Sequence, residues 1–111
     1  MQFSGKNVLV TGAASGIGKE IAISFAQYGD NLLLCARREE KLAELKAELE
    51  ADYDVRVDTF TLDVRNREEV ETKVPQAIKA FGGVDILVNN AGIVLNRSLV
   101  ETSAAEWDEL M

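Results

Sequence analysis

Short apolar runs alternate with longer amphipathic stretches along most of the chain. Four runs are brief and rich in leucine or β-branched residues, which is typical of strands buried in a parallel sheet; they span residues 8–10, 32–36, 55–62 and 84–88. Three stretches between them repeat apolar residues at helical spacing; they span residues 16–28, 39–51 and 66–81. This alternation predicts an α/β fold of βαβ units around a parallel sheet. We expect the Rossmann-type, doubly wound arrangement, in which the strand order is 3-2-1-4.

The expected helices carry start and stop signals. Gly29 favours an end to the first helix, because glycine enters the left-handed backbone region cheaply. Asn66 and Glu69 have the spacing of a capping box at the start of the third helix. Pro75 lies inside that helix and cannot donate a hydrogen bond to the carbonyl of Glu71, so we expect a kink or a break there.

A further capping box lies close to the end of the sequence. Ser103 and Glu106 predict that a fourth helix starts at Trp107, shortly before Met111. We therefore expect residues 1–111 to form a single partial domain, truncated before its second half. On this expectation the fourth strand, at residues 86–88, lies on an open edge of the sheet and favours self-association with another chain.

Composition and charge narrow the choice of partners. Hydrophobic residues make up 47% of the chain and charged residues 28%, which is typical of a globular domain. The net charge of −7 argues against nucleic acid or an anionic membrane as the partner. No apolar run is long enough to span a membrane, and the first residues do not resemble a signal peptide, so we expect a cytoplasmic protein.

Histidine and cysteine usage excludes several chemistries. The chain has no histidine and a single cysteine, Cys35. Catalysis by histidine, an internal disulfide and a multi-cysteine metal site are therefore excluded. Cys35 lies between two apolar residues of an expected strand, where we interpret it as a buried core residue.

The junction between the first strand and the first helix is rich in glycine. Residues 11–18 read Thr-Gly-Ala-Ala-Ser-Gly-Ile-Gly. Gly12 permits a tight turn, while Gly16 and Gly18 leave room for a pyrophosphate and a neighbouring strand to approach the backbone. The N–H groups and positive dipole end of the helix favour an anion there. An ordinary glycine-containing turn is the alternative, since such a triplet alone is a weak signal.

Three motifs, each at the carboxyl end of an expected strand, resemble those of the short-chain dehydrogenase/reductase family. Residues 11–18 match its TGxxxGIG turn, residues 63–64 match its Asp-Val pair, and residues 89–92 match its NNAG element. The resemblance covers the chain from Lys6 to Asp108. It implies a Rossmann-type domain that binds a nicotinamide cofactor, and we expect the cofactor crevice between the first and fourth strands, where the strand order reverses.

The resemblance also implies which residues contact the cofactor: Gly12, Ser15, Gly16, Ile17 and Gly18 at the pyrophosphate and ribose, Asp63 and Val64 at the adenine, and Asn90, Ala91 and Gly92 at the nicotinamide-side ribose. It implies further that Thr11 and Asn89 tie the first and fourth strands together. Two alternatives stay open. Asp63 could instead cap the loop before Asn66, and residues 89–90 could form an ordinary turn at the end of a strand.

The end of the second strand bears on the choice between NAD and NADP. In dinucleotide folds an acidic residue there binds the ribose 2′-hydroxyl of NAD, whereas arginine accommodates the 2′-phosphate of NADP. Here the strand runs into Arg37 and Arg38, with no acidic residue before Glu39. A guanidinium binds phosphate through paired, charge-assisted hydrogen bonds. We expect NADPH to be preferred, with Arg37 as the main contact; the alternative is that both arginines are merely solvated.

The catalytic residues of the family are not found in these 111 residues. The family uses Asn, Ser and a Tyr-x-x-x-Lys pair, but neither Tyr28 nor Tyr53 is followed four residues on by lysine. We assign no catalytic residue and no metal ligand, and expect the chain alone to be inactive. Its parent is expected to transfer hydride between NADPH and a small-molecule carbonyl or alcohol. The alternative is a self-contained, noncatalytic nucleotide-binding or assembly module.

Overall fold

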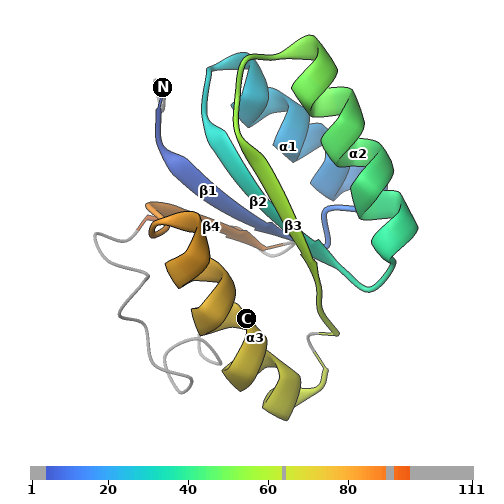
Figure 1. The fold of residues 1–111 in the computed structure, drawn as a ribbon, viewed down its shortest axis with the longest axis vertical. Coiled ribbons are helices and arrows are strands. Elements are labelled where there is room, and N and C mark those ends of the chain that lie inside the picture. Colours follow the sequence, from blue (N-terminus) through green and yellow to red (C-terminus); the bar gives the residue numbers. More distant parts are fainter. Residues whose placement is uncertain (1–4, 64, 90–91, 96–111) are drawn as a thin grey trace.

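A computed structural model describes residues 5–63, 65–89 and 92–95 of the chain. In this part strands and helices alternate as predicted, and a further strand follows (Figure 1). The elements are β1 (Asn7–Thr11), α1 (Gly16–Gln27), β2 (Asn31–Ala36), α2 (Glu39–Asp52), β3 (Val57–Thr61), α3 (Arg67–Phe81), β4 (Ile86–Asn89) and β5 (Gly92–Leu95).

The strands form a sheet in the order β3-β2-β1-β4-β5. The first four are parallel and follow the predicted order 3-2-1-4, which confirms the doubly wound, Rossmann-type arrangement. Thr11 lies beside Cys35, and Cys35 beside Phe60, so the carboxyl ends of β1, β2 and β3 meet at one edge. The loops that follow these three strands are thereby brought together.

β5 corrects the prediction that the fourth strand lies on an open edge. Gly92–Leu95 pairs antiparallel with β4, with Gly92 opposite Asn89 and Leu95 opposite Ile86. β1 lies along the other side of β4, so β4 is paired on both sides. Self-association through an exposed edge of β4 therefore loses its physical basis. The apolar run after Gly92 is the signal for this strand, hidden by its place directly after the Asn-Asn-Ala-Gly motif.

The core has two layers because successive residues of each strand point to opposite faces of the sheet. Figure 1 shows α1 and α2 on one face and α3 on the other. The buried side chains on the first face include Val8, Val10, Leu32, Leu34, Phe25, Leu42, Leu45 and Leu49. Those on the second face include Leu9, Leu33, Cys35, Leu87, Val70, Val74, Ile78 and Phe81. Packing on both faces holds the sheet, and with it the loops at its carboxyl edge.

Helix α3 runs without a break from Arg67 to Phe81, which excludes the predicted break at Pro75. Pro75 and Glu71 are both exposed, so water can satisfy the Glu71 carbonyl that lacks a backbone donor. The capping box is half formed. Asn66 Oδ1 accepts a hydrogen bond from the N–H of Glu69 at 3.1 Å. The Glu69 carboxylate instead accepts from the N–H of Asp63 at 3.3 Å.

Cys35 is buried on the α3 side of the sheet, as predicted for a core residue. Its burial raises the pKa of the thiol to about 12. The predicted start of a helix at Trp107 lies outside the described residues. Within the part of the chain that the structure describes, no helix has the length and apolar character needed to cross a membrane.

One carboxyl group is buried at the amino-terminal edge of the sheet. Asp30 lies between α1 and β2 and has no exposed surface. Its Oδ1 accepts a hydrogen bond from the N–H of Lys6 at 3.1 Å, whereas its Oδ2 has no partner among the described residues. Burial raises the pKa of Asp30, and the charge of Asp85 adds to this rise while Lys6 opposes it.

Candidate functional site

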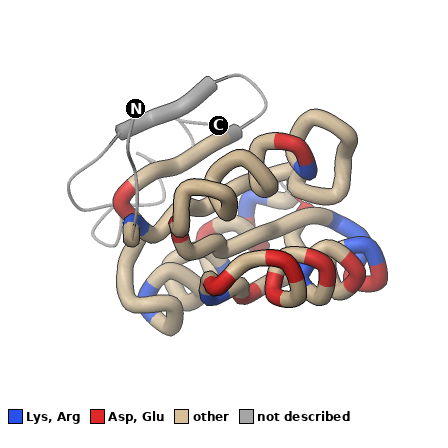
Figure 2. Tube along the Cα trace, turned by 90° about the horizontal axis from the view of Figure 1, so that it is seen from above, with Lys and Arg blue, Asp and Glu red and all other residues tan. Residues whose placement is uncertain are grey.

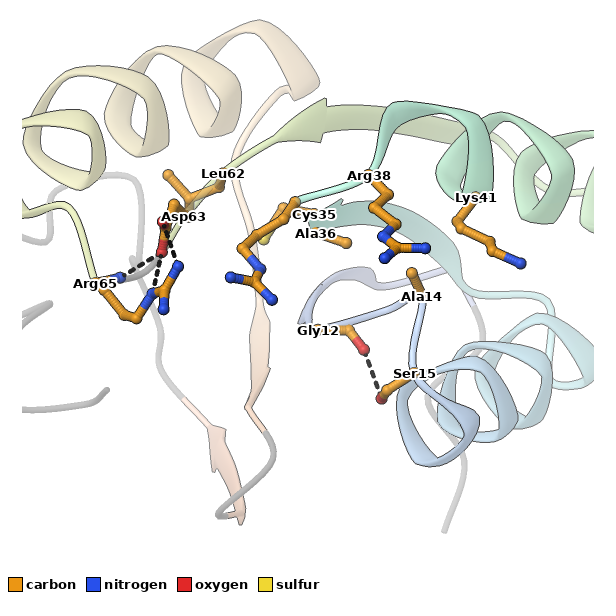
Figure 3. Close-up of a pocket in the computed structure, with 11 residues that line it drawn as sticks. Gly12, Ala14, Ser15, Cys35, Ala36, Arg38, Lys41, Leu62, Asp63 and Arg65 are labelled. Carbon is orange, nitrogen blue, oxygen red and sulfur yellow. Dashed lines mark hydrogen bonds and ion pairs between the residues drawn. The ribbon is translucent and has the colours of Figure 1, made fainter.

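A cleft of about 510 Å³ opens at the carboxyl edge of the sheet, over the ends of β1, β2 and β3 (Figure 3). The described residues that line it are Gly12, Ala14, Ser15, Cys35, Ala36, Arg37, Arg38, Lys41, Leu62, Asp63 and Arg65. They come from three strand-to-helix connections that are far apart in the sequence, together with the end of β2 and the first turn of α2. The parallel register of the strands places these loops side by side, where a doubly wound fold binds its ligand.

The glycine-rich turn is closed by its own hydrogen bonds. Gly12 has a φ of +63°, a conformation that side chains disfavour. The Ser15 hydroxyl donates to the Gly12 carbonyl at 2.8 Å and accepts from the N–H of Gly18 at 3.1 Å. Ser15 is thereby the N-cap of α1. The N–H of Ala13 donates to the carbonyl of Cys35 at 3.1 Å, which attaches the turn to β2.

Gly16 and Gly18 serve different purposes in this turn. A Cβ atom at Gly18 would overlap the Gly12 carbonyl oxygen and would lie 2.9 Å from Ala13 Cα, so Gly18 allows α1 to pack on the turn. A Cβ atom at Gly16 would meet nothing within 4 Å. Among the described residues, the N–H groups of Gly16 and Ile17 find no acceptor. These two donors at the start of a helix form an anion-binding arrangement beside open space.

Four cationic side chains and one carboxylate belong to the described lining of the cleft. Arg37 and Arg38 follow β2, Lys41 lies in the first turn of α2, and Arg65 follows β3, while Asp63 is the acidic residue. The chain as a whole has 19 acidic and 12 basic residues. Figure 2 shows Asp and Glu spread along the chain, with many of them on helices. The cleft is therefore locally positive on a negative molecule, which favours an anionic ligand.

Asp63 and Arg65 form a closely fitted pair on one side of the cleft (Figure 3). Asp63 Oδ1 accepts from the backbone N–H and from Nε of Arg65, each at 3.0 Å, and Oδ2 accepts from an Arg65 Nη at 3.0 Å. The hydrogen bonds from Arg65 lower the pKa of Asp63 to about 2, and Arg37 contributes a smaller lowering. The bond from the backbone N–H of Arg65 also closes the loop that follows Asp63. The alternative interpretation of Asp63 as a loop cap therefore has structural support too.

The cleft brings together five of the predicted cofactor residues: Gly12, Ser15, Arg37, Arg38 and Asp63. The first turn of α1 contains three others, beside the cleft and not in its lining: Gly16, Ile17 and Gly18. Gly92 begins β5, opposite Asn89. Val64, Asn90 and Ala91 lie outside the described residues, so the crevice predicted between the ends of β1 and β4 is described on its β4 side only as far as the backbone of Asn89.

Three further observations complete the site. The Thr11 hydroxyl donates to the Val88 carbonyl at 3.4 Å, so Thr11 joins β1 to β4 through Val88, while the side chain of its predicted partner Asn89 lies outside the described part of the structure. Lys41 and Arg65 line the cleft although the sequence pattern did not single them out. Their positions in the sequence could have indicated this, because each lies within a few residues of a predicted cofactor contact and shortly after the end of a strand. In the described residues no group of three or more His, Cys, Asp or Glu side chains could hold a metal ion.

A parallel sheet with a glycine-rich strand–helix turn and cations at its carboxyl edge defines the class of dinucleotide-binding α/β proteins. Within that class the chain belongs to the short chain dehydrogenase family, whose profile matches residues 6–111. This is the family that the motifs at residues 11–18, 63–64 and 89–92 resemble, so the resemblance is confirmed. The chain therefore belongs to a family of oxidoreductases.

The relatives differ in the molecules that their names mention. The 3beta-hydroxysteroid dehydrogenase 2 of Eggerthella lenta is 43% identical over 109 residues, which cover 97% of this chain and 42% of the relative. The L-sorbose reductase of Gluconobacter frateurii, solved with NADPH and L-sorbose, has a TM-score of 0.75 and 40% identity, over 96% of this chain and 41% of that one.

A short chain dehydrogenase/reductase of Burkholderia phymatum, solved with NAD, has a TM-score of 0.70 and 34% identity over 78% of this chain and 31% of its own. The chain thus spans less than half the length of the relatives that it matches. The solved relatives bind NADPH in one case and NAD in the other, so membership of the family does not choose between the two cofactors.

Proposed function

We propose that this chain is the NADP(H)-binding portion of a short-chain oxidoreductase, which transfers hydride between the nicotinamide ring and a carbonyl or alcohol substrate. One observation carries the choice of cofactor. Arg37, Arg38 and Lys41 line the cleft at the end of β2, and the sequence has no acidic residue between β2 and Glu39 to accept from the 2′-hydroxyl of NAD. A 2′-phosphate carries about two negative charges near neutral pH, which these cations can neutralise.

The glycine-rich turn is proposed to hold the pyrophosphate. The unpaired N–H groups of Gly16 and Ile17 are the donors, and the open space at Gly16 admits the anion. Ser15 and Gly12 keep the turn closed through their 2.8 Å hydrogen bond. Gly18 contributes indirectly, because it lets the helix approach closely enough for its dipole to act on the anion.

The two ends of the cofactor are assigned to different loops. Arg37 is proposed as the principal contact of the 2′-phosphate, and the Asp63 carboxylate as the acceptor for the adenine amino group. By resemblance to the family, the nicotinamide-side ribose is assigned to Asn90, Ala91 and Gly92, with Val64 beside the adenine. The bound nicotinamide supplies or accepts the hydride, and the residues of this chain bind and orient it. Because these 111 residues contain no Tyr-x-x-x-Lys pair, we propose that they do not turn over a substrate alone.

Binding of the reduced cofactors tests this function directly. The chain is titrated with NADPH and, in parallel, with NADH, and the change in nicotinamide fluorescence gives both dissociation constants. We expect NADPH to bind more tightly. In Arg37→Asp the introduced carboxylate repels the 2′-phosphate and can accept from the 2′-hydroxyl of NADH. Loss of a charge-assisted pair of about 1.5–3 kcal/mol should weaken NADPH binding by roughly 10- to 100-fold, while NADH binding is retained or improved.

Lys79→Asp is the matched control for this experiment. It changes the charge by the same amount at an exposed position in the last turn of α3, away from the cleft. It should leave the NADPH/NADH ratio unchanged. If Arg37→Asp and Lys79→Asp lower NADPH affinity equally, the effect is one of net charge and the assignment of Arg37 is wrong. Binding of neither cofactor by the folded wild-type chain would refute the proposed function.

A further inference from the structure

Between β3 and α3, Arg65 holds the Asp63 carboxylate in a single arrangement. This arrangement bears on which base the site accepts. We propose that Arg65 is a positioning residue for base selectivity: it occupies all but one acceptor position of Asp63, so that the site takes a 6-amino purine and rejects a 6-oxo purine. This inference rests on the proposed function, in which Asp63 faces the adenine.

The selectivity follows from counting lone pairs. An ionised carboxylate offers about four acceptor positions. Arg65 uses three of them, two on Oδ1 and one on Oδ2. No other described residue donates to this carboxylate. One position on Oδ2 is left, which matches a single N–H of an exocyclic amino group. The oxygen of a 6-oxo purine would face the carboxylate with no proton between them, and its N1–H could reach the remaining position only if the base shifted in the site.

The backbone of the loop keeps this remaining position in place. The N–H of Asp63 donates to Glu69 Oε1 at 3.3 Å, and its carbonyl accepts from the N–H of Asn66 at 2.9 Å. Glu69 Oε1 is itself held by Lys73 Nζ at 3.1 Å, which also donates to the Thr61 carbonyl at 3.0 Å. The backbone of Asp63 is thus anchored to both β3 and α3, and Arg65 holds the carboxylate on it, so the free lone pair has a defined direction.

The pairing differs from an ordinary surface ion pair. The Arg65 side chain is 72% exposed and that of Asp63 is 31% exposed, and isolated pairs of this exposure have little effect on stability. Here one residue contributes both a backbone N–H and a side-on guanidinium, which fixes the geometry. The same contacts keep the pKa of Asp63 at about 2. The carboxylate is therefore an acceptor throughout the physiological range and has no proton to offer a 6-oxo group.

Calorimetric titration with NADP⁺ and with its hypoxanthine analogue tests this inference. For the wild-type chain we expect NADP⁺ to bind about tenfold more tightly, as for one hydrogen bond to a charged group. Arg65→Ala removes a positive charge and weakens both ligands, but it should also bring their ratio to within about threefold, since the carboxylate can then rotate. Arg65→Lys restores the charge without the side-on geometry and should leave the ratio low.

A second readout separates positioning from a purely structural role. The pKa of Asp63, followed by carbon-detected NMR at its carboxyl carbon, should rise from about 2 toward its ordinary value in Arg65→Ala. Arg67→Ala is the control, because Arg67 is equally exposed and pairs with the Glu71 carboxylate at 3.0 Å outside the cleft lining. It should change neither the base ratio nor the pKa of Asp63.

The outcomes are distinguishable. If the wild-type chain binds NADP⁺ and the analogue equally, or if Arg65→Ala keeps or enlarges the base ratio, the positioning role is overturned while the proposed function stands. If the wild-type chain binds neither ligand, both are overturned. A reduced ratio in Arg65→Ala together with a raised Asp63 pKa, and neither change in Arg67→Ala, supports the inference.

Discussion

Adding one methyl group at Gly18 measures how closely α1 is packed against the glycine-rich turn. In the structure a Cβ atom at this position would overlap the Gly12 carbonyl oxygen. It would also lie 2.9 Å from Ala13 Cα and from the Gly12 carbonyl carbon, whereas ordinary contacts begin at 3.4 Å. All three neighbours are backbone atoms, so no side chain can rotate away. The helix or the turn must move.

The energetic cost can be estimated from the groups that would be displaced. The Gly12 carbonyl accepts from the Ser15 hydroxyl at 2.8 Å and from the Ser15 N–H at 3.1 Å, and a shift weakens both bonds. Overpacking of this kind costs about 1–3 kcal/mol, and each hydrogen bond contributes about 1 kcal/mol. Alanine regains about 1 kcal/mol relative to glycine within a helix. We expect Gly18→Ala to lower the free energy of unfolding by about 2 kcal/mol.

Gly16→Ala is the matched control two residues away in the same turn of helix. Its Cβ atom meets nothing within 4 Å, and the glycine does not have a positive φ. The substitution should stabilise the free chain by about 0.5–1 kcal/mol through helix propensity and the unfolded state. On the proposed function it should nevertheless weaken NADPH binding, because the methyl group enters the space assigned to the pyrophosphate.

Urea unfolding followed by far-ultraviolet circular dichroism measures both effects. With a urea dependence of about 1–3 kcal/mol per molar, the two variants should differ in midpoint by roughly 1 M or more. Gly18→Ala should unfold before the wild-type chain and Gly16→Ala after it. Equal midpoints for the two variants would show that α1 does not approach Gly12 closely. They would also refute the claim that Gly18, and not Gly16, is required for the packing of α1.

Two other predictions concern buried titratable groups. Asp30→Asn should stabilise the chain at pH 7, because it removes a buried charge while its Oδ1 can still accept from Lys6. Since the folded pKa is raised above the unfolded value of 3.8, wild-type stability relative to Asp30→Asn is greatest below that value. It is lost as pH rises through the folded pKa, by about 1.4 kcal/mol for each pH unit that separates the folded pKa from the unfolded one. Urea midpoints of both chains across this pH range check the trend. The exposed Asp54→Asn is the control, whose effect on stability should not depend on pH. A gain in stability in Asp30→Asn that is equally independent of pH would contradict the prediction. Cys35, with its thiol pKa raised to about 12 by burial, should resist iodoacetamide in the folded chain at pH 8 and react once urea unfolds it. Mass spectrometry distinguishes the two states, and rapid labelling without urea would mean that the core on the α3 side opens readily.

Local pattern was sufficient for much of this fold. The spacing of apolar residues predicted the strands and the helices, because the period of an amphipathic element records which of its faces is buried. The order of the strands followed from the doubly wound arrangement that we expected for them. The glycine spacing in residues 11–18 likewise predicted a tight turn, which the hydrogen bond from the Ser15 hydroxyl to the Gly12 carbonyl closes. Features of this kind depend on neighbours a few residues apart, which the sequence displays directly.

Other features depend on which distant segments meet, and the tertiary structure alone decides them. Pairing with β4 makes a strand of Gly92–Leu95, and exposure to solvent lets α3 continue through Pro75. Packing against Gly12 makes Gly18 necessary for the fold, whereas the space beside Gly16 stays open.

The same reason explains why the cleft contains more charges than the sequence pattern assigned to it. Lys41 and Arg65 are ordinary charged residues when each is considered beside its own neighbours. The parallel register of β1, β2 and β3 carries their loops to one edge of the sheet, where they join Arg37 and Asp63 in a single lining. The chemistry of a site is set by distances in space, and spacing along the chain predicts those distances only within one element.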